Sequence, residues 1–231
     1  NYNGAETNIT YNTGQYGGAA VFNGSSSKIE LPNTSLGITD ASNFSISYWF
    51  NTNSTTQDNQ SVFWANGSNA GARFGSGINS TSQGGDTSVY FGMPINGTFT
   101  YINSGTSAFT ANTWVHVVCV KSSTTGMSLY VDNVLKATNT GATGSGSATA
   151  TGKNSIGMYH TSSDGFFFNG SIDQVRIYNS ALSSTDVTNI YNNEIQANSG
   201  GGSVAESSLT LSAGTAYNVT IGAGGTGVNL T

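Results

Sequence analysis

Large apolar residues recur at every second position in many short stretches of the chain, and this period of two is typical of β-strands that bury one face. In residues 43–50, for example, Ser45, Ser47 and Trp49 lie between aromatic and aliphatic positions. About a dozen such stretches, separated by turns rich in Gly, Asn and Ser, predict an all-β fold, an antiparallel β-sandwich. The expected strands are 19–22, 28–31, 43–50, 61–65, 72–74, 88–93, 99–102, 114–120, 127–132, 134–137, 155–160, 166–168 and 172–178, with a short edge strand around Ile9 and Tyr11.

Turns and loops are indicated by residue type. Asp132 and Asn133 separate two adjacent strands, and both residue types tolerate the positive φ that a two-residue hairpin turn demands. Residues 75–87 and 138–153 consist mostly of Gly, Ser, Thr and Ala. We therefore expect these two stretches to be loops or weak edges.

The most apolar stretch, residues 114–120, is expected to be a central strand. Trp114 in this strand and Trp49 in another are interpreted as structural residues. His116 is expected in the core, because no second metal-ligating residue lies at zinc spacing from it. Cys119 is the single cysteine, so we expect a small buried side chain without an internal disulfide.

The stretch 172–178 is expected to form the closing strand. Its alternation places Asp173, Val175 and Ile177 on one face, which we take as the core face. Asp173 is either a metal or sugar ligand or a carboxylate that accepts hydrogen bonds from loop amides. We favour the structural role, because a buried acid needs hydrogen-bond donors wherever it lies.

A short helix is expected to follow the closing strand. Ser183 and Asp186 have the spacing of a capping box, in which each side chain bonds the other residue's backbone. An apolar stripe then runs from Val187 to Tyr191. The sequence therefore predicts one short helix near residues 183–192.

Charge and length limit the classes of partner. Only 7% of the 231 residues are charged, and the net charge is -5. The six Lys and Arg residues are scattered along the chain and form no basic stripe for phosphates, so we expect no nucleic-acid partner. No apolar run reaches the roughly 18 residues of a membrane span, so no membrane insertion is expected.

Five segments occur in a fixed order along the chain: 14–32, 44–49, 114–118, 129–135 and 170–183. Together they resemble the LamG-like jelly-roll domains of the concanavalin A-like lectin/glucanase superfamily, over roughly residues 5 to 194. This resemblance implies an antiparallel jelly-roll β-sandwich that binds glycans or proteins, serves in adhesion, decorates virions or accompanies catalytic domains. Such domains usually open with one more strand, so we expect a domain over 1–194 that lacks its first strand.

The sequence changes character after this domain. Residues 195–207 are interpreted as a linker. Residues 208–231 alternate small apolar residues with Gly and Thr, and resemble glycine-rich segments of phage tail and fibre proteins. We interpret them as the start of a glycine-rich β segment.

Catalysis is not expected, although the superfamily includes glycoside hydrolases. Glycoside hydrolysis needs two carboxyl groups about 5 to 10 Å apart. None of the eleven acidic residues has an acidic neighbour on the same face of a predicted strand, and Asp173 has Ser171 and Val175 beside it. An enzyme of the glycoside hydrolase type is therefore the least favoured interpretation.

Glycan binding is a more specific hypothesis than catalysis for this sequence. Sugars expose apolar C–H faces and hydroxyl groups, so a glycan site needs an aromatic platform beside polar side chains. The alternative is that these aromatics belong to the core, as most sandwich aromatics do. The candidates are Tyr90, Tyr101, Tyr159 and Phe166, with Asp164 as a polar partner.

No cofactor is required by this interpretation, but calcium is a candidate. Asp58, Asp86 and Asp164 lie in polar loops, and calcium prefers oxygen ligands from such loops. The three acids show no Asp-x-Asp spacing, so a site would have to be assembled from distant loops.

Together these features predict a non-enzymatic adhesion or decoration module, extracellular or on a virion surface such as that of a phage. The expected partner is a cell-surface glycan or a neighbouring structural protein, within a larger homo- or hetero-oligomeric assembly. The alternative is a purely structural subunit, which should bury more than about 1,000 Å² against a neighbour.

Overall fold

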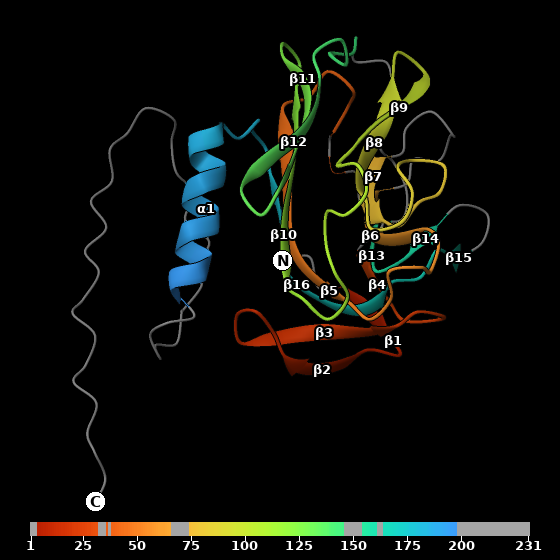
Figure 1. Ribbon diagram of the computed structural model, residues 1–231. Helices are drawn as coiled ribbons and strands as arrows, with labels where there is room; N and C mark the ends of the chain where they lie inside the picture. The colour runs from red at the N-terminus through yellow and green to blue at the C-terminus, as the bar shows by residue number, and fades with distance from the viewer. Residues whose placement is uncertain are drawn as a thin grey trace, which may run out of the picture.

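Two seven-stranded antiparallel sheets lie face to face and define the architecture (Figure 1). The computed structural model describes residues 4–31, 36, 38–65, 74–145, 154–160 and 164–197. Within them, a two-stranded ribbon and one helix complete the fold. The predicted antiparallel jelly-roll β-sandwich with one short helix is thereby confirmed.

We call the two large sheets sheet A and sheet B. Sheet A contains, in spatial order, β1 (Ala5–Thr7), β4 (Lys28–Leu31), β13 (Asn154–Ile156), β6 (Gln60–Ala65), β7 (Phe74–Ile78), β8 (Val89–Ile95) and β9 (Thr98–Asn103). Sheet B contains β12 (Val134–Asn139), β11 (Gly126–Val131), β10 (Val115–Ser122), β5 (Phe44–Thr52), β16 (Asn169–Tyr178), β3 (Gly18–Asn23) and β2 (Thr10–Thr13). The ribbon is β14 (Tyr159–His160) with β15 (Asp164–Gly165), and the helix is α1 (Ser184–Ala197).

The core lies between the inner faces of the two sheets. In β5, Phe44, Tyr48 and Phe50 are each at most 1% exposed and belong to one apolar cluster with residues of both sheets. Trp49 points to the opposite face of β5, as the alternation predicts. Cys119 is a free, buried cysteine in the same core. The chain has few charged residues that could form ion pairs. Burial of this apolar surface is therefore the main contribution to the stability of the fold.

The turn between β11 and β12 has the conformation that its residue types predict. Asp132 and Asn133 have φ values of 47° and 63°, so both central residues adopt the left-handed conformation of a two-residue hairpin turn.

Four strand predictions were wrong in extent. The expected loop 75–87 begins with four strand residues, because β7 runs to Ile78. The expected strand 166–168 is not a strand, since Phe166 has a φ of 52°, and the last strand starts at Asn169 instead of 172. The expected strand 155–160 is interrupted at Gly157, whose φ is 77°.

The closing strand β16 contains a bulge that changes which side chains face inward. The register with β5 shifts between Asp173 and Arg176, and Gln174 has a φ of 52°. Asp173 therefore pairs with Trp49 on the outer face, and the prediction that it shares the core face with Val175 is wrong. The alternation was broken by one extra residue, which residue types alone do not reveal. Asp173 does accept a hydrogen bond from the loop amide of Tyr16 at 2.8 Å.

Helix α1 covers the outer face of sheet B (Figure 1). The capping box is present: the amide of Ser183 donates to Asp186 at 2.8 Å, and the amide of Asp186 donates to the Ser183 hydroxyl at 3.2 Å. Val187 is fully buried against Val118 and Val120 of β10. The helix continues to Ala197, beyond the predicted end near 192 and beyond the expected domain end at 194. Residues 208–231 lie outside the described residues.

A polar cluster fixes the far end of this helix. The Trp49 indole N–H donates to a carboxylate oxygen of Glu194 at 2.5 Å, and Arg176 forms an ion pair with the same carboxylate. The Trp49 ring also stacks on Tyr191 at 5.8 Å between centroids. Glu194 is only 8% exposed. Because its carboxylate contacts Trp49 and Arg176 of sheet B, the last turns of the helix are held against the sheet.

His116 lies in this cluster, beneath α1 and not between the two sheets. Its Nε2 is 3.1 Å from the Ser47 hydroxyl oxygen and 3.6 Å from a carboxylate oxygen of Glu194. Burial, with a smaller contribution from Arg176, lowers the pKa of His116 from 6.5 to about 3. The imidazole is therefore neutral at pH 7. Trp114 precedes β10 and is only half-buried, unlike the strand residue predicted.

In the described part of the chain, no helix has the length and apolar character needed to cross a bilayer.

Removing the Glu194 carboxylate should loosen the helix. Glu194→Ala leaves the Trp49 N–H and the Arg176 guanidinium without their common acceptor, so we expect a loss of about 1–3 kcal/mol in the free energy of unfolding. Urea unfolding followed by tryptophan fluorescence measures it. Asn193→Ala, at an exposed position of the same helix, is the matched control and should change little.

The low pKa of His116 predicts a pH dependence of stability. Between pH 6.5 and about 4 the unfolded chain binds a proton at this position and the native chain does not, so the free energy of unfolding should fall as pH falls, by up to about 1.4 kcal/mol per pH unit. His116→Gln should remove this contribution. Unfolding curves of both proteins at pH 7 and 4.5 test it, and equal pH dependence would contradict the assignment.

Candidate functional site

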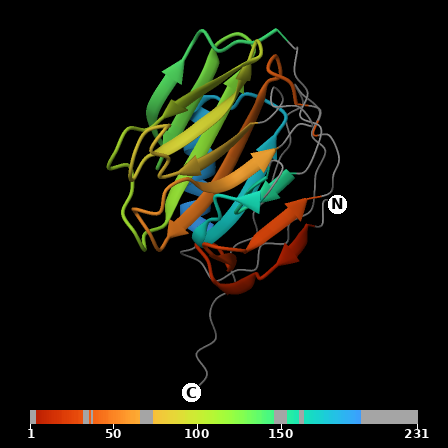
Figure 2. The same ribbon diagram turned by 90° about the vertical axis from the view of Figure 1, so that its right-hand side faces the viewer.

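The two outer faces of the sandwich differ. Sheet B is covered by α1, whereas sheet A turns its outer face away from the helix (Figure 2). Cross-strand pairing places Trp64, Gly75, Gly92 and Tyr101 in one row on this face. We call the aromatic residues of this region the aromatic face: Trp64, Tyr90, Phe99, Tyr101, Tyr159 and Phe166.

Glycines make room for the rings of the aromatic face. A Cβ on Gly75 would lie 2.0 Å from the Trp64 ring, one on Gly77 would lie 2.7 Å from the Tyr90 hydroxyl, and one on Gly92 would lie 2.7 Å from the Phe99 ring. The three glycines therefore form a furrow in the sheet surface, and the aromatic rings occupy it. β7 carries two of them, which explains why a strand with so little side chain is nevertheless buried.

Four rings form a continuous row across several strands. Trp64 lies between Phe99, at 6.4 Å, and Tyr159, at 4.6 Å between centroids. Tyr159 in turn contacts Phe166 at 5.3 Å. Edge and tilted contacts at these distances stabilise aromatic pairs, so the row holds its shape without covalent support.

A small pocket opens within this row. It has a volume of about 120 Å³, and Asn59 and Gln83 line it together with five aromatic residues, Trp64, Tyr90, Phe99, Tyr159 and Phe166. The indole N–H of Trp64 is buried and has no hydrogen-bond partner among the described residues. A buried donor without an acceptor costs free energy, and an acceptor supplied by a ligand would remove that cost.

The exposure of the predicted residues separates their roles. Phe166 and Tyr101 are 46% and 41% exposed, so both can meet a ligand directly, and Tyr159 is half-buried. Tyr90 is only 3% exposed and its pKa is raised by burial. Tyr90 therefore cannot be the exposed platform that was predicted, although it lines the pocket.

Sequence reasoning missed Trp64 and Phe99. Both looked like ordinary strand aromatics, and only the pairing of Trp64 with Gly75 and the position of Phe99 over Gly92 place them on the outer face. The sequence did contain one indication: Gly75 and Gly77 lie at alternate positions, so one face of their strand carries no side chains there.

The three candidate calcium ligands are not gathered. Asp58 accepts the amide of Thr81 at 2.9 Å, and Asp164 pairs with Lys28 at 2.7 Å. Asp86 lies in the 79–88 loop. No group of three or more His, Cys, Asp or Glu side chains that could hold a metal occurs within the described ranges. These acids do not fit a calcium site as placed.

Two carboxylates do approach each other at the border of the aromatic face. Glu30 and Asp164 both contact the Nζ of Lys28, at 3.3 and 2.7 Å. The two carboxylates thus share one ammonium group as an ion-pair partner.

The two antiparallel sheets form a jelly-roll β-sandwich, the fold of the family that the sequence resembles. In agreement, residues 23–188 match the Laminin_G_3 family, described as the concanavalin A-like lectin/glucanases superfamily, and the chain belongs to it. No curated protein sequence matches the chain.

Several solved structures have folds similar to that of this chain. Domain 4 of AbnA, a GH43 extracellular arabinanase from Geobacillus stearothermophilus, solved in complex with arabinotriose, is 21% identical with a TM-score of 0.61, over 80% of this chain and 82% of that domain. The binding domain of Paraclostridial Mosquitocidal Protein 1 is 17% identical with a TM-score of 0.64, over 84% and 48%. That of botulinum neurotoxin serotype G is 14% identical with a TM-score of 0.62, over 84% and 47%.

The chain thus spans about half the length of these toxin binding domains. At such identities the likeness shows the fold alone.

The furrow can be tested by filling it. Gly75→Ala places a methyl group 2.0 Å from the Trp64 ring, so we expect a loss of about 1–3 kcal/mol in the free energy of unfolding. Gly18→Ala is the matched control, since its added Cβ meets nothing nearer than 3.9 Å. Urea unfolding of both variants measures the difference, and equal stabilities would show that Trp64 moves away freely.

Proposed function

We propose that the protein is a non-enzymatic glycan-binding module and that the aromatic face is its binding surface. The observation that carries the proposal is the row of four rings, with a pocket that Asn59 and Gln83 also line. Rings stack on the C–H faces of sugars, and amides and the indole bond their hydroxyl groups.

The residues of the aromatic face have different proposed roles in sugar binding. Tyr101 and Phe166 are the exposed rings on which sugar units stack. Trp64 donates its indole N–H to a sugar oxygen at the pocket. Asn59 and Gln83 form hydrogen bonds with sugar hydroxyl groups and so discriminate between their orientations. The complex of the similar arabinanase domain with arabinotriose supports this class of ligand for the fold.

Absence of catalysis is part of the same proposal. Glu30 and Asp164 both form an ion pair with Lys28, and we assign this group to the polar edge of the site and not to catalysis.

The biological setting is also proposed here. A module of this type acts at the surface of a virion or another extracellular assembly, where few charges and many hydroxyl and amide side chains keep it soluble. The resemblance of residues 208–231 to phage glycine-rich segments supports that setting. A purely structural subunit is the competing function.

A glycan array probed with the full chain, followed by calorimetry on the best ligand, tests the proposal. Tyr101→Ala should weaken binding about tenfold through loss of stacking. Trp64→Phe keeps a ring but removes the N–H, and should weaken binding by a similar factor. Tyr11→Ala, an aromatic that is 61% exposed on β2 of the other sheet, should have no effect.

Two outcomes would contradict the proposal. A flat array would leave the structural subunit as the better function. Binding that tolerates both aromatic-face variants, with their stability confirmed by urea unfolding, would place the glycan elsewhere. The array is repeated with a chelator, because loss of binding without calcium would restore the predicted calcium site.

A further inference from the structure

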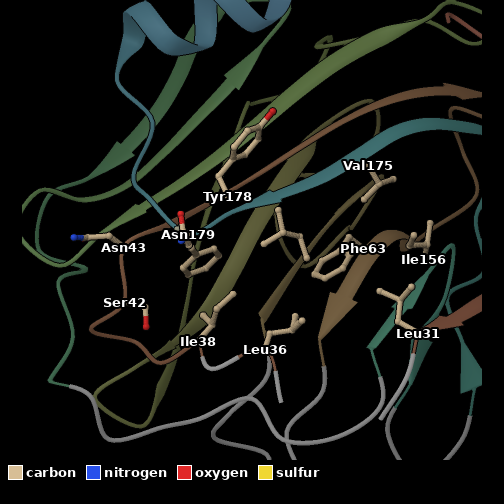
Figure 3. Close-up of a pocket in the computed structure, with 12 residues that line it drawn as sticks. Leu31, Leu36, Ile38, Ser42, Asn43, Phe63, Ile156, Val175, Tyr178 and Asn179 are labelled. Carbon is tan, nitrogen blue, oxygen red and sulfur yellow. The ribbon is translucent and has the colours of Figure 1, made fainter. Parts of the chain in front are cut away.

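Two cavities of the sandwich differ in the side chains that line them. The larger one is a cleft of about 810 Å³ between the sheets, beside β16 (Figure 3). Leu, Ile, Val and Phe residues make up most of its lining, among them Phe63, Val175 and Ile177. The small pocket of the aromatic face is lined instead by aromatic residues together with Asn59 and Gln83. Since a few placed polar groups fix the identity and orientation of a ligand, the small pocket is the more selective of the two.

The small pocket admits one substituent and not a whole sugar. Its volume is about 120 Å³, whereas pockets that enclose a complete small molecule measure roughly 300–1,000 Å³. Phe166 both lines this pocket and is exposed at the surface. A sugar ring that stacks on Phe166 can therefore direct one of its substituents into the pocket.

The polar groups of the pocket are mainly hydrogen-bond donors. The indole of Trp64 donates and cannot accept, and its buried N–H has no partner among the described residues. The Oε1 of Gln83 already accepts a hydrogen bond from the Ser80 hydroxyl at 2.7 Å, so it is the Nε2 donors of this amide that can serve a ligand. A group that matches this lining must present a strong acceptor, such as a carbonyl oxygen.

The rest of the lining favours a neutral, apolar group beside that acceptor. None of the described residues that line the pocket is charged, and its rings, which include Tyr90, Phe99 and Tyr159, suit a methyl group. Asp58 adjoins Asn59 in the chain, and the net charge of the protein is -5. An anionic substituent, such as the carboxylate of an acidic sugar, is therefore disfavoured.

We propose that this pocket binds the acetamido group of an N-acetylhexosamine, an inference that rests on the proposed glycan binding and specifies its ligand. The acetyl carbonyl oxygen accepts hydrogen bonds from the Trp64 indole and from the Nε2 of Gln83. The methyl group packs among the rings, and the amide oxygen of Asn59 accepts the acetamido N–H. A 6-deoxyhexose has a methyl group without the carbonyl, and a plain hexose has a hydroxyl group without the methyl, so each satisfies only part of the lining.

Matched sugars that differ only at this substituent test the proposal on the full chain. Chitotriose is compared with cellotriose, and N-acetylgalactosamine with galactose. Calorimetry should show that the acetylated member of at least one pair binds about tenfold more tightly, because it alone adds the carbonyl bonds and the buried methyl group. Saturation-transfer NMR should show the strongest transfer at the acetyl methyl protons.

Two variants locate the acetamido group in the pocket. Gln83→Glu keeps the shape of the side chain and an oxygen for the Ser80 hydroxyl, but it replaces the donors by an acceptor. It should reduce the preference for the acetylated sugar to about twofold or less, and Trp64→Phe should reduce it in the same direction. Asn193→Asp adds the same charge at an exposed position of α1 and should leave the preference unchanged. Urea unfolding confirms that each variant is folded.

The failure of this inference is distinguishable from the failure of glycan binding itself. Equal affinity for both members of each pair, with loss of both on Tyr101→Ala, overturns the acetamido assignment and leaves glycan binding in place. A preference that survives both Gln83→Glu and Trp64→Phe means that the acetyl group binds elsewhere, and it also overturns the assignment. A flat glycan array overturns the proposed function and this inference together.

Discussion

A sandwich of two wide sheets buries only the inner face of each, so the treatment of the two outer faces determines what this molecule can do. The sequence offers few charges with which to make those faces soluble. Sheet B is covered by a helix that Trp49, Arg176 and Glu194 hold in place. Sheet A instead carries aromatic rings laid into a glycine furrow. One outer face thus contributes to stability, and the other carries the surface that we propose for glycan binding.

Each of the two outer faces carries a tryptophan with a buried indole N–H, but the two N–H groups differ in their hydrogen bonding. On sheet B the Trp49 indole N–H finds the Glu194 carboxylate, and the pair closes the fold. On sheet A the Trp64 indole N–H is equally buried but has no partner within the described ranges. A satisfied buried donor stabilises a structure, whereas an unsatisfied one can still gain a hydrogen bond from a ligand. This contrast supports our proposal that glycans bind on sheet A.

The sequence predicted those features that follow from local periodicity. The inward face of β5, the Asp132-Asn133 turn and the Ser183–Asp186 capping box were all readable, because each depends on neighbours in sequence. The orientation of Asp173 was not readable, since one bulge residue at Gln174 reverses the alternation. Trp64 and Phe99 were missed for a related reason. Their role depends on glycines in strands that are adjacent only after folding.

The cleft beside β16 extends this reasoning from side chains to backbone. The bulge that turns Asp173 outward also ends the pairing with β3, so the end of this pairing and the cleft beside it arise from one local irregularity. Val175 and Ile177 then face an apolar space whose opposite wall is already formed by sheet A.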